Sequence, residues 1–241
     1  MISTATLEKL RTFDTPTICN IIEVFDVRPR NTGYMDQRIV AAFPEMPPIV
    51  GFAATATFRA FAPVRDSDAY SSYDKQVERF GELSGPAIVV FQDLDSPSVA
   101  ATFGEIMCTT YQSFGAVGLI TSGTGRDLDQ VHKIGLPIFT NGACCSHGYS
   151  SVTQIHIPVH VGGIAIYPDD LLHADRNGVT TIPKDIAAEV ADIGDAYVAA
   201  EMLIIDAMRE QRGNLKLLRE RQAAQKAELA KLRAQVSRAK K

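Results

Sequence analysis

Apolar residues in the first 142 positions recur at two different spacings, and each spacing predicts a kind of element. Helical spacing marks 7–26, 66–83, 99–113 and 127–134, while short apolar runs typical of strands cover 49–63, 86–94, 116–122 and 136–142. Within the first region, Asp14 and Thr15 are candidate capping groups, and Thr15 precedes Pro16 at the predicted start of a second helix. Strands that alternate with helices in this way predict an α/β protein in which helices cover a sheet.

The pattern changes after Gly142, where glycine and proline interrupt the chain every few residues. Residues 151–183 are therefore predicted to form several short strands joined by tight turns. We expect 168–175 and 177–183 to be antiparallel neighbours, because an Arg-Asn-Gly turn signal lies between them. A long helical pattern then runs from Pro183 to Gln211.

A second helical pattern follows Gly213, which interrupts the first. Its apolar residues fall on a short heptad frame, which they occupy at positions 215, 218, 229, 232 and 236. Two interpretations stay open at this point. The segment is either a solvated basic helix that frays toward the chain end, or a helix that pairs with a neighbouring subunit in an oligomer.

Composition narrows the class of protein. The chain is 46% hydrophobic and 22% charged, as in ordinary globular domains. No apolar run reaches the roughly 18 residues of a membrane span, and the first residues lack the basic and apolar regions of a secretory signal. None of the four cysteines shows zinc-site spacing, and the adjacent pair 144–145 is atypical of a disulfide framework. We expect a reduced, cytoplasmic protein with no membrane partner.

Charge divides the chain into two predicted domains. The segment 208–241 holds eleven lysines and arginines and three glutamates, a net of +8, so 1–207 carries −12 of the overall −4. We therefore predict a catalytic domain over 1–207 and a basic helical tail over 208–241. No nucleic-acid motif accompanies the basic tail, and we expect no nucleic-acid partner.

One segment, GEIMCTTYQSFGAVGLITSGTGRD at 104–127, carries most of the candidate chemistry. It places Glu105 near the predicted start of a helix and Arg126 and Asp127 after a strand, where crevices form in open α/β sheets. Free N–H groups at a helix start hold anions, the arginine fork suits a carboxylate, and aspartate suits Mg²⁺ or Mn²⁺. This set would fit a small keto acid chelated to a metal ion. The alternative is a capped helix beside a surface Arg–Asp ion pair.

Two other groups of polar residues keep alternative roles. Asp93 and Asp95 follow a predicted strand and either line the crevice or cap the helix predicted at 99–113. Cys144, Cys145 and His147 lie together after another strand, where they either pack a loop or supply a Cys–His nucleophile.

The segment 104–127 resembles the signature of the RraA-like family, in which an acid, twenty residues and Arg-Asp follow one another in the aldolase members. A second stretch, VGGIAIYPDDLLHADRNGVTTIP at 161–183, is similar to the family's Gly-Gly, Pro-Gly-Asp and Asp-x-x-Gly-Val sequence, with Asp169 in place of a glycine. IVGFAATA at 49–56 is a weaker match. The family includes class II 4-hydroxy-4-methyl-2-oxoglutarate aldolases and their oxaloacetate decarboxylase relatives.

The resemblance implies a fold and a set of roles. The fold would be an α/β, swivelling β/β/α sandwich with a C-terminal helical extension. Asp127 would ligate a divalent cation, Mg²⁺ or Mn²⁺, and Arg126 would grip the keto acid. Glu105 would position a water at the metal that shuttles a proton. The backbone that would hold the substrate carboxylate belongs to Gly104, Glu105, Ile106 and Met107.

The resemblance also implies an assembly, either a homotrimer or a homohexamer with interfacial sites, in which Glu201 of a neighbouring subunit would contribute an acid. The implied reaction is cleavage of a carbon–carbon bond in a 4-hydroxy-2-keto dicarboxylic acid or in oxaloacetate through a pyruvate enolate. The residues favour the metal route over a Schiff-base lysine, because Lys75, Lys133 and Lys184 lie in polar, helix-like settings. The alternative function is a non-catalytic regulatory protein, since the family's namesake regulates a ribonuclease by protein contact.

Overall fold

A computed structural model describes residues 2–63 and 73–238 of the chain. The helices are α1 (Thr4–Leu10), α2 (Thr15–Val24), α3 (Tyr73–Glu78), the 3₁₀ turn η1 (Arg79–Glu82), α4 (Glu105–Ser113), α5 (Leu128–Ile134), α6 (Ala187–Glu210) and α7 (Leu215–Val236). The strands are β1 (Val40–Ala41), β2 (Ile49–Arg59), β3 (Ala87–Asp93), β4 (Ala101–Phe103), β5 (Gly118–Thr121), β6 (Thr124–Gly125), β7 (Ile138–Thr140), β8 (Ser151–Ile155), β9 (Val159–Val161), β10 (Ile164–Ile166), β11 (Leu171–Asp175) and β12 (Gly178–Ile182).

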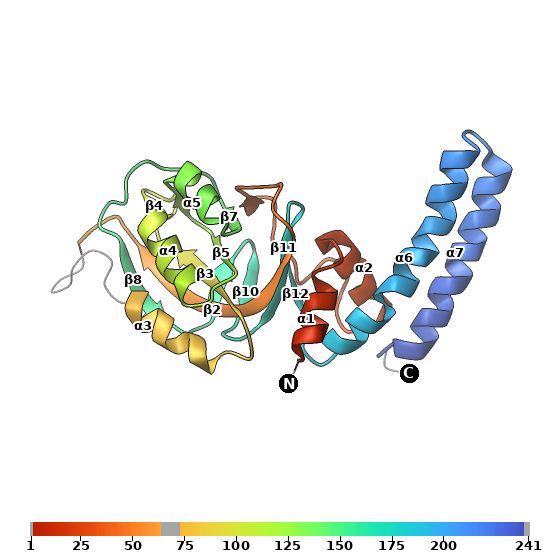
Figure 1. Ribbon diagram of the computed structural model, residues 1–241, viewed down its shortest axis with the longest axis horizontal. Coiled ribbons are helices and arrows are strands. Elements are labelled where there is room, and N and C mark those ends of the chain that lie inside the picture. The colour runs from red at the N-terminus through yellow and green to blue at the C-terminus, as the bar shows by residue number, and fades with distance from the viewer. Residues whose placement is uncertain (1, 64–72, 239–241) are drawn as a thin grey trace.

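The main sheet is mixed. Its strands follow the order β1-β7-β5-β3-β2-β11-β12, and β8 also pairs with the long strand β2. Strands β2, β3, β5 and β7 run parallel, whereas β11 and β12 pair antiparallel as expected. Two small sheets, β4–β6 and β9–β10, complete the strands that the structure describes. Figure 1 shows β2 curving beneath α4 and α5, which cover one face of the sheet.

Strand β3 lies between two separate cores. Its side chains alternate, so that Val89 and Phe91 join the cluster under α4 and α5, while Ile88 and Val90 join the cluster on the opposite face. Both faces of this central strand are therefore buried, which explains why the sequence shows a continuous apolar run instead of an apolar–polar alternation.

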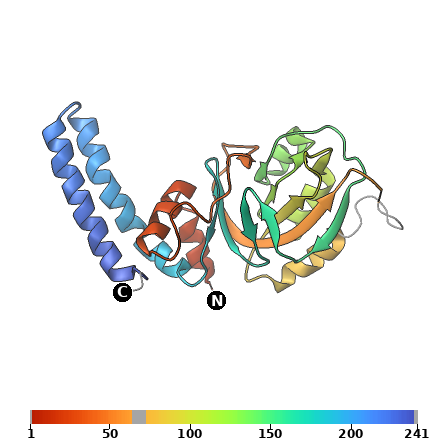
Figure 2. The same cartoon turned by 180° about the vertical axis from the view of Figure 1, so that it is seen from behind.

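A third core joins the N-terminal helices to the C-terminal ones. Helices α1 and α2 lie between the sheet and the α6–α7 pair, which extends away from the sheet (Figures 1 and 2). His173 on β11 connects this layer to the sheet: its Nδ1 lies 2.9 Å from the Thr15 hydroxyl and its Nε2 lies 3.2 Å from the Leu10 carbonyl oxygen. Because a carbonyl can only accept, Nε2 carries the proton and Nδ1 accepts from Thr15.

Helix α7 folds back along α6 and packs on its own chain. Leu232 and Val236 are buried in the cluster formed with α2 and α6, and Arg233 lies 3.4 Å from Asp26. The heptad frame therefore serves an intrachain helical hairpin, and a role in an oligomer stays a prediction. The predicted division at 207/208 falls within α6, and the division itself also stays a prediction.

The structure corrects one local prediction and decides another. The helix predicted at 99–113 begins only at Glu105, because residues 101–103 form β4 and pair with β6. Of the two capping candidates, Asp14 is confirmed as the cap of α2, because its Oδ1 accepts the Thr17 N–H at 2.8 Å, whereas Thr15 is the first helical residue. The first residues of the helix predicted at 66–83 lie outside the described chain. Within the described chain, no helix combines the length and hydropathy needed to cross a membrane.

Candidate active site at the amino end of α4

The small parallel sheet β4–β6 brings the two ends of the segment 104–127 together. Phe103 pairs with Gly125, and the Arg126 N–H donates to the Phe103 carbonyl at 3.2 Å. The chain then enters α4 directly after Gly104 and α5 directly after Asp127. Residues separated by about twenty positions thereby become neighbours, as the acid-to-Arg-Asp spacing had suggested.

Two glycines make this approach possible by leaving space. A Cβ at Gly125 would lie 1.8 Å from Cζ of Phe103, inside the ring that closes the strand pair. A Cβ at Gly104 would lie 2.7 Å from Asp127 Oδ2 and 3.1 Å from Arg126 Nε. Gly104 is in extended backbone, so the glycine is needed for space and not for its conformational freedom.

The Asp127 carboxylate is fixed at one oxygen. Its Oδ2 accepts the Glu105 N–H at 3.1 Å and lies 3.8 Å from Arg126 Nε. Asp127 has a left-handed backbone with φ 57°, which is uncommon for a residue other than glycine and turns its side chain toward α4. Within the described residues, no hydrogen bond occupies Oδ1. Both side chains keep solvent contact, at 27% exposure for Arg126 and 34% for Asp127.

The amino end of α4 presents free backbone donors. Gly104 is its N-cap and has no side chain to satisfy them, and the first helical bond runs from the Cys108 N–H to the Gly104 carbonyl. Among the described residues, no acceptor faces the N–H groups of Ile106 and Met107. A helix start of this kind, together with the arginine beside it, can bind a carboxylate.

A small pocket of about 10 Å³ lies beside this arrangement. Its lining residues are Ala101, Phe103, Gly104, Ile106, Met107, Arg126, His147 and Ser150. Glu105 and Ile106 on the first turn of α4 are exposed, and Met107 is buried below them. A larger cavity of about 670 Å³ lies at the opposite, amino-terminal ends of the parallel strands. That cavity is lined mainly by apolar residues, so the volume of a cavity does not by itself identify the catalytic site.

His147 belongs to this pocket, although the sequence drew attention to it only as a partner for a cysteine. Its Nδ1 lies 2.7 Å from the Gly148 carbonyl oxygen, which makes Nδ1 the protonated nitrogen. Cys144 instead points its thiol toward the Val99 carbonyl, at 3.9 Å. Burial, followed by the nearby negative charge of Asp127, raises the pKa of the Cys108 thiol to about 12. That thiol stays protonated and is a poor nucleophile.

Glu201 lies elsewhere in the same chain. It accepts a hydrogen bond of 3.4 Å from Asn20 Nδ2, and α6 is separated from α4 and α5 by the N-terminal helices and the sheet (Figure 1). Burial, followed by the negative charge of Glu201, raises the pKa of the neighbouring Tyr197 to about 12. The structure therefore does not bring Glu201 to the pocket within one chain, and its role from a neighbouring subunit stays a prediction.

A metal ion at this pocket would depend on Asp127. Among the described residues, no group of three or more histidine, cysteine, aspartate or glutamate side chains could hold one. The Oδ1 of Asp127, to which no described residue donates a hydrogen bond, nevertheless suits a cation that takes a single protein carboxylate. Mg²⁺ is such an ion, because it retains several waters and accepts oxygen atoms of the substrate.

Comparison with known proteins decides the family. The model of the RraA-like family, described as Aldolase/RraA, matches residues 15–181. The chain belongs to the RraA-like family. The matched region contains Glu105, Arg126 and Asp127, and it ends before α6 begins.

Several sequence relatives of this RraA-like protein carry the name 4-hydroxy-4-methyl-2-oxoglutarate aldolase, given provisionally. The relative from Halalkalibacterium halodurans is 28% identical over 102 residues, which are 42% of this chain and 49% of the relative. The relative from Pseudomonas syringae is 29% identical over 109 residues, which are 44% of this chain and 65% of the relative. The match thus spans only about half the length of the first of these, and it supports a family of lyases but no particular substrate.

Solved structures confirm the predicted fold class. An uncharacterized protein from Pseudomonas syringae superposes with a TM-score of 0.72 at 21% identity, over 92% of this chain and 94% of that one. Streptomyces coelicolor RraAS2, described as an unusual member of the RNase ES inhibitor RraA protein family, gives a TM-score of 0.66 at 21% identity over 87% and 100%. At these identities the likeness concerns the fold alone.

Proposed function

We propose that this RraA-like protein is a divalent-metal-dependent lyase that cleaves a carbon–carbon bond of a small 2-keto acid. The substrate class is a 4-hydroxy-2-keto dicarboxylic acid or oxaloacetate, and both leave a pyruvate enolate. One observation carries the proposal: at the amino end of α4, the Asp127 carboxylate lies 3.8 Å from Arg126 Nε and accepts the Glu105 N–H at 3.1 Å, beside a pocket that Gly104 and Arg126 help to line.

Arg126 and α4 bind the anionic parts of the substrate in this proposal. The substrate carboxylate accepts the N–H groups of Ile106 and Met107, where the helix dipole favours negative charge. The backbone of Arg126 is fixed by its N–H bond to the Phe103 carbonyl, and its Nε lies 3.8 Å from Asp127 Oδ2. In the proposal its guanidinium stabilises the negative charge that grows on the keto oxygen as the carbon–carbon bond breaks. Because both donors are positioned before the substrate arrives, little reorganisation is needed.

Asp127 is the residue that would hold the cation, which when bound supplies a Lewis acid that draws electrons toward the keto oxygen. Glu105 fixes the Asp127 carboxylate through its backbone and carries its own carboxylate on the exposed first turn of α4. In the proposal this second carboxylate orients a water, through which a proton reaches the enolate carbon of the product.

The lysines favour this route over a Schiff base. A Schiff-base lysine needs an apolar pocket that lowers its pKa. No lysine among the described residues is buried, and Lys184 forms an ion pair of 2.7 Å with Asp169. The lysines therefore support a mechanism in which the enolate is stabilised by other groups.

The test is a panel of 2-keto acids, including oxaloacetate and 4-hydroxy-4-methyl-2-oxoglutarate, with Mg²⁺, Mn²⁺ or a chelator and with product identification. We expect pyruvate release that needs the metal and stops with the chelator. Metal without protein is the control for spontaneous decarboxylation. Turnover that ignores the chelator and is trapped by borohydride would contradict the proposal. Absence of turnover with every keto acid would instead favour the non-catalytic regulatory alternative.

A further inference from the structure

A second polar cavity, of about 260 Å³, lies at the carboxyl edge of the main sheet. Its floor comes from three adjacent parallel strands: Gln92 and Asp93 end β3, Ser122 follows β5, and Asn141 follows β7. The carboxyl ends of neighbouring parallel strands are the usual place for ligands in open α/β sheets. The cavity shares no lining residue with the pocket beside Arg126.

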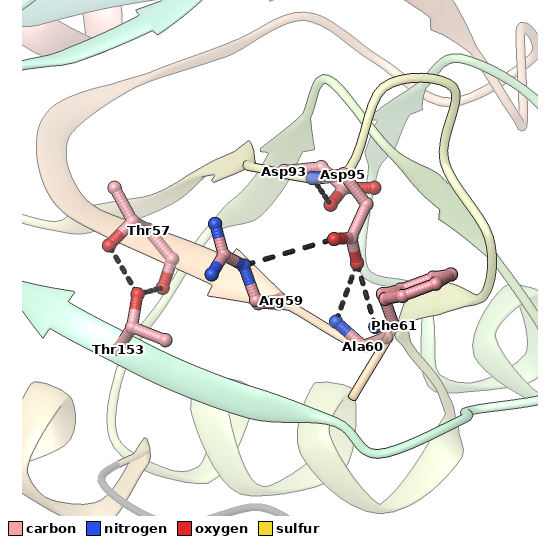
Figure 3. A network of polar contacts seen from close by, with 7 residues as sticks. All are labelled: Thr57, Arg59, Ala60, Phe61, Asp93, Asp95 and Thr153. Atoms are coloured by element: carbon pink, nitrogen blue, oxygen red, sulfur yellow. Dashed lines mark hydrogen bonds and ion pairs between the residues drawn. The ribbon is translucent and has the colours of Figure 1, made fainter. Parts of the chain in front are cut away.

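The Asp93 carboxylate is held in place by a hydrogen bond from the backbone of Asp95. The Asp95 N–H donates to Asp93 Oδ1 at 3.0 Å, and Asp95 is itself fixed through its carboxylate (Figure 3). Its Oδ2 accepts the N–H groups of Ala60 and Phe61 at 2.7 and 2.9 Å, and its Oδ1 lies 3.8 Å from Arg59 Nε. Both aspartates line this second cavity and not the pocket beside Arg126, and neither caps α4, whose N-cap is Gly104.

The walls of the cavity are also fixed. The His160 N–H donates to Gln92 Oε1 at 2.8 Å, which orients the Gln92 amide. Arg38 donates from Nε and Nη2 to the two oxygens of Asp36, at 2.9 and 2.6 Å. A site whose polar groups are held by supporting hydrogen bonds is preorganised for a ligand.

The charges of the cavity restrict what it can bind. Arg38 forms an ion pair with Asp36, so the positive charge of Arg38 is compensated within the protein. Asp93, by contrast, has no cation within ion-pair distance among the described residues, and burial raises its pKa. An anion would meet this carboxylate without a compensating charge, so the cavity disfavours carboxylates and phosphates. The remaining lining, which includes Ser122 and Asn141, offers hydroxyl and amide groups to a neutral ligand.

We propose that this cavity binds a small neutral polyol, either a sugar alcohol or a monosaccharide. The Asp93 carboxylate accepts hydroxyl protons of the ligand, and the amides and hydroxyls around it supply both donors and acceptors. The volume of 260 Å³ equals the share of roughly nine waters in the liquid, which leaves room for a five- or six-carbon polyol. Because keto acids are anions, this cavity is not a second copy of the proposed lyase site.

The test is calorimetric titration of the full chain with xylose, glucose and sorbitol, and with gluconate as the anionic counterpart of the same carbon skeleton. We expect at least one neutral polyol to bind with a Kd near the millimolar range, and gluconate to bind roughly tenfold more weakly or not at all. Asp93→Asn removes the charged acceptor at constant shape and should weaken binding roughly tenfold or more. Asn141→Ala, a second variant at an exposed position, should also weaken it.

Asp127→Asn is the matched control, because it removes a carboxylate from the other pocket and should leave polyol binding unchanged. If circular dichroism shows that Asp93→Asn is unfolded, Asn141→Ala decides the outcome. The inference is overturned if no neutral polyol binds at tens of millimolar, if gluconate binds as tightly as sorbitol, or if binding disappears in Asp127→Asn and persists in Asp93→Asn and Asn141→Ala.

Discussion

Adding one methyl group at Gly104 should disable the proposed active site while sparing the fold. The new Cβ would lie 2.7 Å from Asp127 Oδ2, closer than van der Waals contact allows, and 3.1 Å from Arg126 Nε. The Gly104 backbone is extended and accommodates alanine without strain. The atom that must move is therefore the end of the half-exposed Asp127 side chain, and its movement breaks the hydrogen bond from Glu105.

The magnitude follows from that hydrogen bond. A hydrogen bond to a charged group contributes about 1.5–3 kcal/mol, and each 1.36 kcal/mol corresponds to about a tenfold change in rate. Gly104→Ala should therefore slow metal-dependent pyruvate formation by roughly 10- to 150-fold, and loss of the same hydrogen bond should lower the melting temperature by several degrees while the protein stays folded. Pyruvate release is followed by coupling to NADH oxidation by lactate dehydrogenase.

Gly81→Ala is the matched control, because no heavy atom lies within 4 Å of the added Cβ and no unusual backbone angle is involved. Its activity and stability should equal those of the parent protein. Full activity in a folded Gly104→Ala protein would show that the contact between α4 and Asp127 has no part in catalysis.

Three further predictions concern stability. Burial lowers the pKa of His173 from its usual value near 6.5, so on acidification the unfolded chain binds a proton before the folded protein does. The free energy of unfolding should therefore decline as the pH falls below about 6.5. Urea titrations should show a weaker decline in His173→Gln, and an unchanged decline would contradict this role of His173. Gly125→Ala pushes a methyl group into the Phe103 ring and should cost about 1–3 kcal/mol or more in thermal unfolding. Leu232→Ala, at a buried position of α7, should cost about 2–5 kcal/mol, whereas Leu215→Ala, at 57% exposure, should cost almost nothing; equal effects would show that α7 does not dock on α6.

Much of the fold follows from local pattern. The apolar run that became β3 and the Arg-Asn-Gly turn between β11 and β12 carry their structure in a few adjacent residues. Strand β4 does not, because Ala101–Phe103 is held extended by its pairing with β6, more than twenty residues away, and by the Ala101 N–H bond to the Ser146 carbonyl. Spacing likewise could not distinguish an intrachain α6–α7 hairpin from a coiled coil between subunits, since both use the same apolar seam.

The candidate site also combines features that local sequence indicates with features that depend on distant parts of the chain. The sequence supplied Glu105, Arg126 and Asp127 through one motif, and the structure places them together. It did not place His147 in their pocket, because that proximity depends on how the chain after β7 returns past β4. The Asp93 cavity was even less accessible to sequence reasoning, because Arg38 and His160 reach it from distant parts of the chain.

The most direct measurement is the initial rate of pyruvate formation from oxaloacetate as the concentration of free Mn²⁺ or Mg²⁺ is raised, with the parent protein and Asp127→Asn assayed side by side. We expect a saturable metal dependence for the parent protein, and for the folded variant only the rate of metal without protein. Equal, metal-independent rates for the two proteins would contradict a catalytic metal held by Asp127.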